Sequence, residues 1–270
     1  MIAIHIDKKI SKFGNEIKYT FDFIFHTMGF KYKYIKSLQD VNDDDVIFFY
    51  GLIEPTENEI YLLAHNKAMF FIPVEPDLLQ PGLLKKEDIK TRTTEAKYLK
   101  DIPIITEKDF EVPVVYYKNQ NLFFGSFNFD LIGNIFFHLV NYEYYSIESR
   151  DKYNRLPDNM TCFTEFSHKP FINVFIWLLT EAIKDSIKER KNSFLIKKSY
   201  WPGDEPYAAA ISHNIESLKK WTFQSLIRSA FQDILVFYKI KHLVKNSIRR
   251  LKYIVTNIEE YWNFDLIDFK

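Results

Sequence analysis

Residues 1–38 read MIAIHIDKKISKFGNEIKYTFDFIFHTMGFKYKYIKSL, and the spacing of their apolar side chains changes twice. The segment 1–6 alternates as a strand does, and residues 15–30 then place apolar side chains at helical spacing until Gly29. Residues 31–38 return to alternation. This order of strand, helix and strand predicts a layered α/β domain at the N-terminus.

The pattern continues along the chain. DDDVIFFYG (43–51) and NKAMFFIPV (66–74) predict two short apolar strands. A loop-rich stretch from 73 to 113 follows, and VPVVYY (112–117) with NLFFGS (121–126) predicts a hairpin. Residues 129–146 and 169–190 carry apolar side chains at helical intervals and predict buried helices. The pair Pro202-Gly203 marks the expected boundary between two domains, 1–200 and 206–270.

Composition and charge limit the classes of partner. Of 270 residues, 47% are apolar, which suffices for a sizeable core, and 36 basic residues balance 36 acidic ones. We therefore expect no general attraction to nucleic acid. The longest apolar run, FINVFIWLL from Phe171, is too short for a transmembrane segment. The single cysteine, Cys162, excludes an intrachain disulfide, and the N-terminus lacks a signal-peptide pattern, so the sequence predicts a cytoplasmic protein.

The stretch PYAAAISHNIESLKKW (206–221) places polar side chains directly after a short apolar strand. His213, Asn214 and Glu216 stand where this strand gives way to a predicted helix. In α/β folds the carboxyl ends of strands open onto crevices that hold ligands. The position therefore predicts a site.

The order of apolar strand, His213, Asn214, Ile215, Glu216 and helix resembles the first motif of the polysaccharide deacetylases, carbohydrate esterase family 4, which is usually Thr-His-Asp-Val-Asp. Upstream, FDLIGNIFFHLVNYEYY (129–145), RDKYNRLPDN (150–159) and KPFINVFIWLLTEAI (169–183) are similar to the region that precedes the deacetylase domain in bacterial members. Downstream, EEYWNFD (259–265) is similar to the end of their helical insertion. The resemblance spans residues 127–265.

The resemblance implies deacetylation of acetylated sugars in bacterial surface polysaccharide metabolism, with a divalent metal such as zinc. In that chemistry the metal polarises the acetyl carbonyl and a bound water, and a carboxylate removes the proton of the water. The catalytic base falls on Asn214, and the metal ligands fall on His213 and Glu216. An acetylated carbohydrate is the implied partner.

Two departures from the family pattern predict a catalytically incomplete chain. Asn214 carries an amide, which cannot act as a base at neutral pH, and after Glu216 the sequence offers only His242 where the family has two histidines four residues apart. The residues after Ala208 are also fewer than the roughly 200 that a deacetylase barrel takes. The chain is therefore either a piece of a longer protein or one that has lost the catalytic part. The alternative function is a non-catalytic module that binds a carbohydrate or a partner protein.

Other polar groups have structural interpretations beside functional ones. Ser212 or Asn214 as a helix N-cap, with Glu216 in the first turn, accounts for the 213–216 cluster without a site. His138, Tyr142 and Glu143 could bind sugar, but a packed helix is favoured. The acids at 43–45 could hold a cation, but a solvated loop is favoured. The basic amphipathic stretch 238–255 could meet an anionic membrane, and a solvated face is favoured.

Overall fold

The computed structural model describes residues 1–198 except 38–39, 43–44, 65–66, 97–98, 120–121, 158–159, 162, 164–165, 167 and 190–194, together with residues 247–248, 251–252 and 255. The chain divides into two compact units, Met1–Pro206 and Tyr207–Lys270. In the second unit, Ile248, Leu251 and Val255 are helical and exposed.

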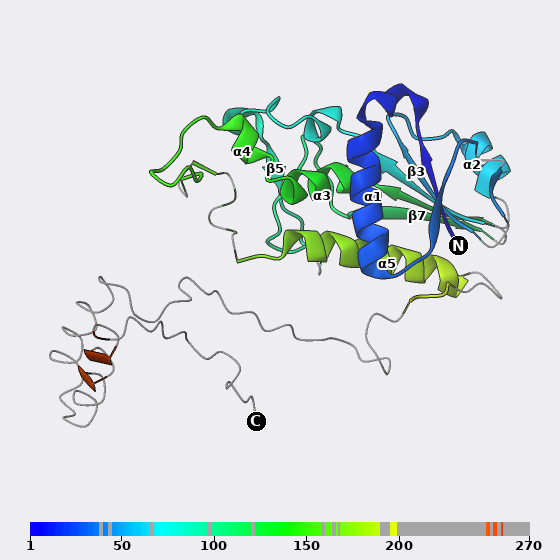
Figure 1. The fold of residues 1–270 in the computed structure, drawn as a ribbon. Helices are drawn as coiled ribbons and strands as arrows, with labels where there is room; N and C mark the ends of the chain where they lie inside the picture. The colour runs from blue at the N-terminus through cyan, green and yellow to red at the C-terminus, as the bar shows by residue number, and fades with distance from the viewer. Residues whose placement is uncertain are drawn as a thin grey trace. The chain divides into compact units, whose positions relative to one another are not determined.

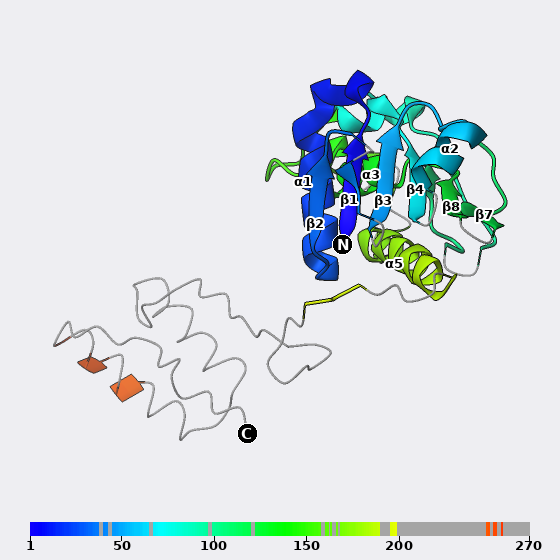
Figure 2. The ribbon, with the colours of Figure 1, turned by 90° about the vertical axis from the view of Figure 1, so that its right-hand side faces the viewer.

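Six strands of the described residues form one sheet in the order β2-β1-β3-β4-β8-β7 (Figures 1 and 2). The first five strands in this order form four parallel pairs, and β7 pairs antiparallel with β8 at one edge. The predicted α/β class is confirmed, as is the predicted hairpin. The strands are β1 (Ile2–Ile6), β2 (Tyr32–Ile35), β3 (Val46–Gly51), β4 (Ala68–Pro73), β7 (Val114–Asn119) and β8 (Leu122–Phe127).

Helix α1 (Gly14–Met28) makes the first crossover, from β1 to β2. Its buried residues include Ile17, Phe21 and Ile24, which recur at helical spacing and pack on the sheet. The helix ends at Gly29, whose left-handed φ of 75° lets its N–H reach the carbonyls of Phe25 and His26. The predicted helix and its predicted end are both confirmed.

Helices α3 (Leu131–Leu139) and α5 (Phe171–Glu189) join α1 on the same face of the sheet, as Figure 2 shows. Together they bury side chains such as Phe48, Phe70 and Phe129 in the main core. Both lie in stretches where buried helices were predicted. The second of these stretches forms one helix, whereas the first breaks at Asn141 (φ 52°) and resumes as the single turn α4 (Glu143–Ser146).

The opposite face is covered by the short helix α2 (Glu57–Ala64), which makes the crossover from β3 to β4. Ile60 of α2 packs there with Ile47, Phe71 and Phe124. Because α1 and α2 leave the sheet on opposite faces, the fold is doubly wound. The sequence analysis did not predict α2.

The loop-rich stretch between β4 and β7 lies beyond the carboxyl end of β4. It contains two short 3-10 helices and a two-stranded ladder. Its elements are η3 (Pro76–Leu79), η4 (Lys86–Asp88), β5 (Thr91–Arg92) and β6 (Ile104–Ile105).

Candidate functional site

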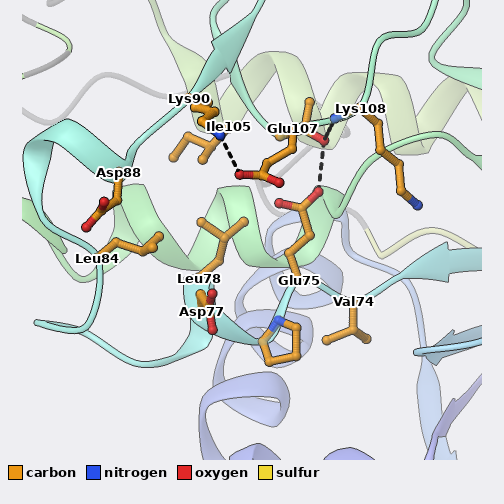
Figure 3. Close-up of a pocket in the computed structure, with 12 residues that line it drawn as sticks. Val74, Glu75, Asp77, Leu78, Leu84, Asp88, Lys90, Ile105, Glu107 and Lys108 are labelled. Atoms are coloured by element: carbon orange, nitrogen blue, oxygen red, sulfur yellow. Dashed lines mark hydrogen bonds and ion pairs between the residues drawn. The ribbon is translucent and has the colours of Figure 1, made fainter.

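A pocket of about 340 Å³ lies between the carboxyl end of β4 and the loop-rich stretch (Figure 3). Figure 3 shows the side chains of Glu75 and Glu107 pointing toward the same space, with Leu84 and Asp88 on the side opposite Lys108. Parallel sheets bind ligands at this edge. We call it the Glu75 pocket; it is lined by Val74, Glu75, Pro76, Asp77, Leu78, Leu84, Asp88, Lys90, Ile105, Thr106, Glu107 and Lys108.

Asp130 is the buried group that holds the pocket to the sheet. It precedes α3, and its Oδ1 accepts the N–H of Gly133 at 2.7 Å as a helix cap. Its Oδ2 accepts the backbone N–H of Glu75 at 2.8 Å. The hydroxyl of Tyr50, on β3, lies 2.9 Å and 3.0 Å from the two carboxylate oxygens. One fully buried carboxyl therefore fixes β3, the start of α3 and the segment that carries Glu75.

Asn134 fixes the other wall of the pocket to the same helix. Its side-chain oxygen accepts the N–H of Ile105 at 2.8 Å, and its amide donates to the carbonyl of Ile105 at 3.0 Å. The amide also donates to the carbonyl of Asp130 at 2.8 Å. The position of Ile105 sets that of Thr106, which follows it. Asn134 thus holds the Thr106 segment opposite Glu75.

Glu75 and Thr106 meet inside the pocket. The Thr106 hydroxyl donates to Oε1 of Glu75 at 2.9 Å and accepts the backbone N–H of Lys108 at 3.2 Å. At the rim, Lys90 and Glu107 form an exposed ion pair of 2.9 Å. Such an exposed pair contributes little to stability. The pocket therefore has a hydrogen-bonded polar pair inside and an exposed ion pair at its rim.

Burial raises the pKa values of Asp130 and Glu75. Burial raises the pKa of Asp130 to about 7, although the N–H groups of Glu75 and Gly133 and the hydroxyl of Tyr50 favour its charged form. Burial also raises the pKa of Glu75 above its ordinary value, while the hydrogen bond from Thr106 and the charge of Lys108 lower it. Perturbed acids in a pocket are a feature of ligand and catalytic sites. Near pH 7, Asp130 is therefore protonated in part and can donate as well as accept a hydrogen bond.

The sequence-predicted site residues His213, Asn214 and Glu216 lie outside the described residues. Their chemistry supplies two metal ligands, His213 and Glu216, fewer than the three or more that a tight zinc site requires. Weak binding of a metal at His213 and Glu216 therefore stays a prediction. Among the residues that the structure does describe, no three His, Cys, Asp or Glu side chains gather as metal ligands.

The cluster at 138–143 is part of the core, as the favoured interpretation predicted. His138 stacks on Phe171 with ring centroids 4.5 Å apart, and burial lowers its pKa to about 4. Tyr142 is fully buried, and its hydroxyl donates to the carbonyl of Gln80 at 2.6 Å. These side chains stabilise the loop-rich stretch from behind the pocket.

The prediction of a solvated loop at 43–45 is wrong for Asp45, which is 2% exposed. Its carboxylate pairs with Lys33 at 3.0 Å and with the amino group of Met1 at 3.1 Å. These charges compensate its burial and lower its pKa.

Sequence reasoning missed Asp130 and Glu75. Asp130 precedes an apolar helical run, and that N-cap signal could have identified it as a cap. Glu75 lies in a proline-punctuated loop directly after a strand, and only its strand-end position could have pointed to it.

These features define an open, doubly wound α/β domain with a polar pocket at the carboxyl ends of its strands. A model described as a family of unknown function (DUF7033) matches residues 6–188, and the chain belongs to this family. No curated protein and no solved structure matches the chain. Among the described helices, none has the length and apolarity needed to cross a membrane.

Proposed function

We propose that this chain is a cytoplasmic, polysaccharide deacetylase-like protein whose first unit binds an acetylated carbohydrate without transforming it. The resemblance of residues 127–265 to the deacetylases supports the ligand class. The amide of Asn214 at the position of the catalytic base supports binding without catalysis. The observation that carries the proposal is the half-buried Glu75 carboxyl, held by Thr106 inside a pocket of suitable size.

The chemistry of the walls fits one acetylated sugar ring. Leu78, Leu84 and Ile105 form an apolar surface on which an acetyl methyl group can pack. Glu75 and Thr106 offer the convergent polar groups that fix the orientation of a small ligand. About 340 Å³ lies at the lower end of the range for ligand pockets, which favours a single ring over a chain.

The charges of the walls favour a neutral sugar. Four carboxyl groups line the pocket, those of Glu75, Asp77, Asp88 and Glu107, against the two ammonium groups of Lys90 and Lys108. A phosphorylated or uronic sugar would therefore meet net repulsion. We expect N-acetylglucosamine to bind more tightly than its 6-phosphate.

The experiment is an isothermal titration of the protein with N-acetylglucosamine, chitotriose and glucose. We expect millimolar affinity for the acetylated sugars. Glucose should bind more weakly, because it has no acetyl group to pack on the apolar wall. Glu75→Gln and Thr106→Val should each weaken binding about five- to fiftyfold, because a buried polar partner is lost. The matched control is Glu95→Gln, an exposed carboxyl outside the pocket.

Three outcomes would overturn the proposal. Equal binding of glucose and N-acetylglucosamine would remove the acetyl group as the recognised feature. A separate hollow, lined by the exposed Tyr61 and Tyr117, could also stack a sugar ring. If Tyr117→Ala abolishes binding and Glu75→Gln does not, the Glu75 pocket is not the site. Release of acetate from chitotriose would contradict the non-catalytic assignment.

A further inference from the structure

A second hollow at the carboxyl edge lies where the direction of strand addition reverses. From β1 the chain crosses to β2 on one side, whereas β3 lies on the other side of β1. The crossovers α1 and α2 cover opposite faces, which leaves a crevice between the ends of β1 and β3. We call it the switch-point hollow; its volume is about 550 Å³, and it is lined by His5, Asp7, Lys8, Lys9, Lys36, Ser37, Phe49, Ile53, Glu54, Pro55 and Glu59.

Three lysines surround this hollow. Lys8 and Lys9 follow β1, and Lys36 follows β2. All three are exposed, and none forms an ion pair within the described part of the chain. By contrast, Lys33, Lys90 and Lys118 of the same unit do form such pairs. The three ammonium groups of the hollow are thus available to a ligand.

Two of the three carboxylates in the hollow are engaged in local caps. Asp7 accepts the N–H of Lys9 at 3.0 Å, at the start of η1 (Lys8–Phe13). Glu59 accepts both the N–H and the hydroxyl of Thr56 at 2.8 Å, and these bonds lower its pKa. Glu54 is the third carboxylate. The hollow therefore holds three carboxylates beside its three lysines: Asp7 and Glu59 keep their charge but are held by local hydrogen bonds, whereas the three ammonium groups form no ion pair with described residues.

His5 adds a buried polar atom at the hollow. Its Nδ1 is buried and has no hydrogen-bond partner among the described residues. Its ring lies against Phe49, with centroids 5.3 Å apart, and burial lowers its pKa. Because Nδ1 itself is buried, His5 contributes to the wall of the hollow through its ring, which packs on Phe49.

We infer that the switch-point hollow binds a phosphorylated small molecule, with its phosphoryl group among Lys8, Lys9 and Lys36. Lysine meets phosphate as a point charge, so three lysines that line one hollow suit a group that carries up to two negative charges. The volume exceeds that of a phosphate, and the rest of the ligand would lie against Phe49 and Ile53, the latter 63% exposed. This inference does not depend on sugar binding in the Glu75 pocket.

The test is an NMR titration of backbone amides at constant ionic strength with inorganic phosphate, glucose 6-phosphate, adenosine monophosphate, sulfate and glucose. Phosphate and at least one phosphomonoester should shift the amides of residues 7–9 and 36–37, and glucose should not. If one ester binds more tightly than inorganic phosphate, the hollow also recognises the part of that ester that is attached to the phosphoryl group. Equal shifts with sulfate and phosphate in all variants would reduce the effect to general anion screening and overturn the inference.

Charge variants make this test more specific, because removing a lysine and removing a glutamate should change the affinity for phosphate in opposite directions. Lys8→Gln and Lys36→Gln should each weaken phosphate binding about two- to fivefold, and Glu54→Gln should strengthen it by a similar factor. Lys12→Gln is the matched control, since Lys12 is on the same 3-10 helix but lies over the ring of Phe13. An effect of Lys12→Gln equal to that of Lys8→Gln, or no effect of Glu54→Gln, would contradict a specific site.

Discussion

The Glu75 pocket and the switch-point hollow share one edge of the sheet, but they are built in different ways. The first depends on hydrogen bonds between residues far apart in sequence, such as Tyr50 with Asp130 and Glu75 with Thr106. The second consists of strand ends and local caps, such as Asp7 with Lys9. A substitution in the pocket's supports should therefore change both stability and binding. A substitution in the hollow should change binding alone.

The largest effect is expected at Asp130. Asp130→Ala removes a helix cap and leaves the Tyr50 hydroxyl and the Glu75 N–H buried without their partner. We expect a loss of about 3 kcal/mol or more in the free energy of unfolding, measured with urea. The control Asp109→Ala, at an exposed ion pair with Arg92, should change stability by less than about 0.5 kcal/mol. Equal effects of the two would show that Asp130 does not support the pocket.

Gly133→Ala tests the close approach of α3 to the Asp130 carboxyl. An added Cβ would lie 2.8 Å from the carboxyl carbon of Asp130, so we expect a loss of about 1–3 kcal/mol despite the better helix propensity of alanine. At Gly14, the first residue of α1, an added Cβ meets nothing within 4 Å. Gly14→Ala should therefore be neutral or stabilising. If both substitutions change the free energy of unfolding in the same direction, the close packing at Gly133 is contradicted.

The pH dependence of stability tests the buried acid itself. Because the folded-state pKa of Asp130 is about 7, above its ordinary 3.8, the folded state binds more protons between these values. Its contribution is fully present below about pH 4 and is lost as the pH rises to about 7, by at most about 1.4 kcal/mol per pH unit. Asp130→Asn should flatten this slope in urea unfolding. If the slope persists in that variant, other groups such as Glu75 cause the pH dependence of stability.

The smallest expected effect concerns metal. His213 and Glu216 supply at most two protein ligands, so the chain should bind zinc weakly, and His213→Ala should change little. Equilibrium dialysis that finds one tightly bound zinc per chain would contradict this expectation.

The sequence predicted those elements whose signals are local. Gly29 ends α1 where the apolar spacing stops, and the hairpin β7–β8 follows from two β-rich runs. The capping pair Thr56 and Glu59 was also a local signal for α2 that could have been used. The Glu75 pocket had no such signal, because it depends on contacts between residues 29 to 80 apart, from Ile105 with Asn134 to Tyr50 with Asp130. The site predicted at His213, Asn214 and Glu216 stays a prediction.

The most direct test of the central claim is to map N-acetylglucosamine onto the protein by the chemical shifts of backbone amides. The account predicts that the largest shifts fall on residues 75–78 and 105–108, and that Glu75→Gln suppresses them while leaving the phosphate-induced shifts at residues 7–9 intact. Shifts confined to residues 57–61 and 117, or no shifts at millimolar sugar, would contradict it.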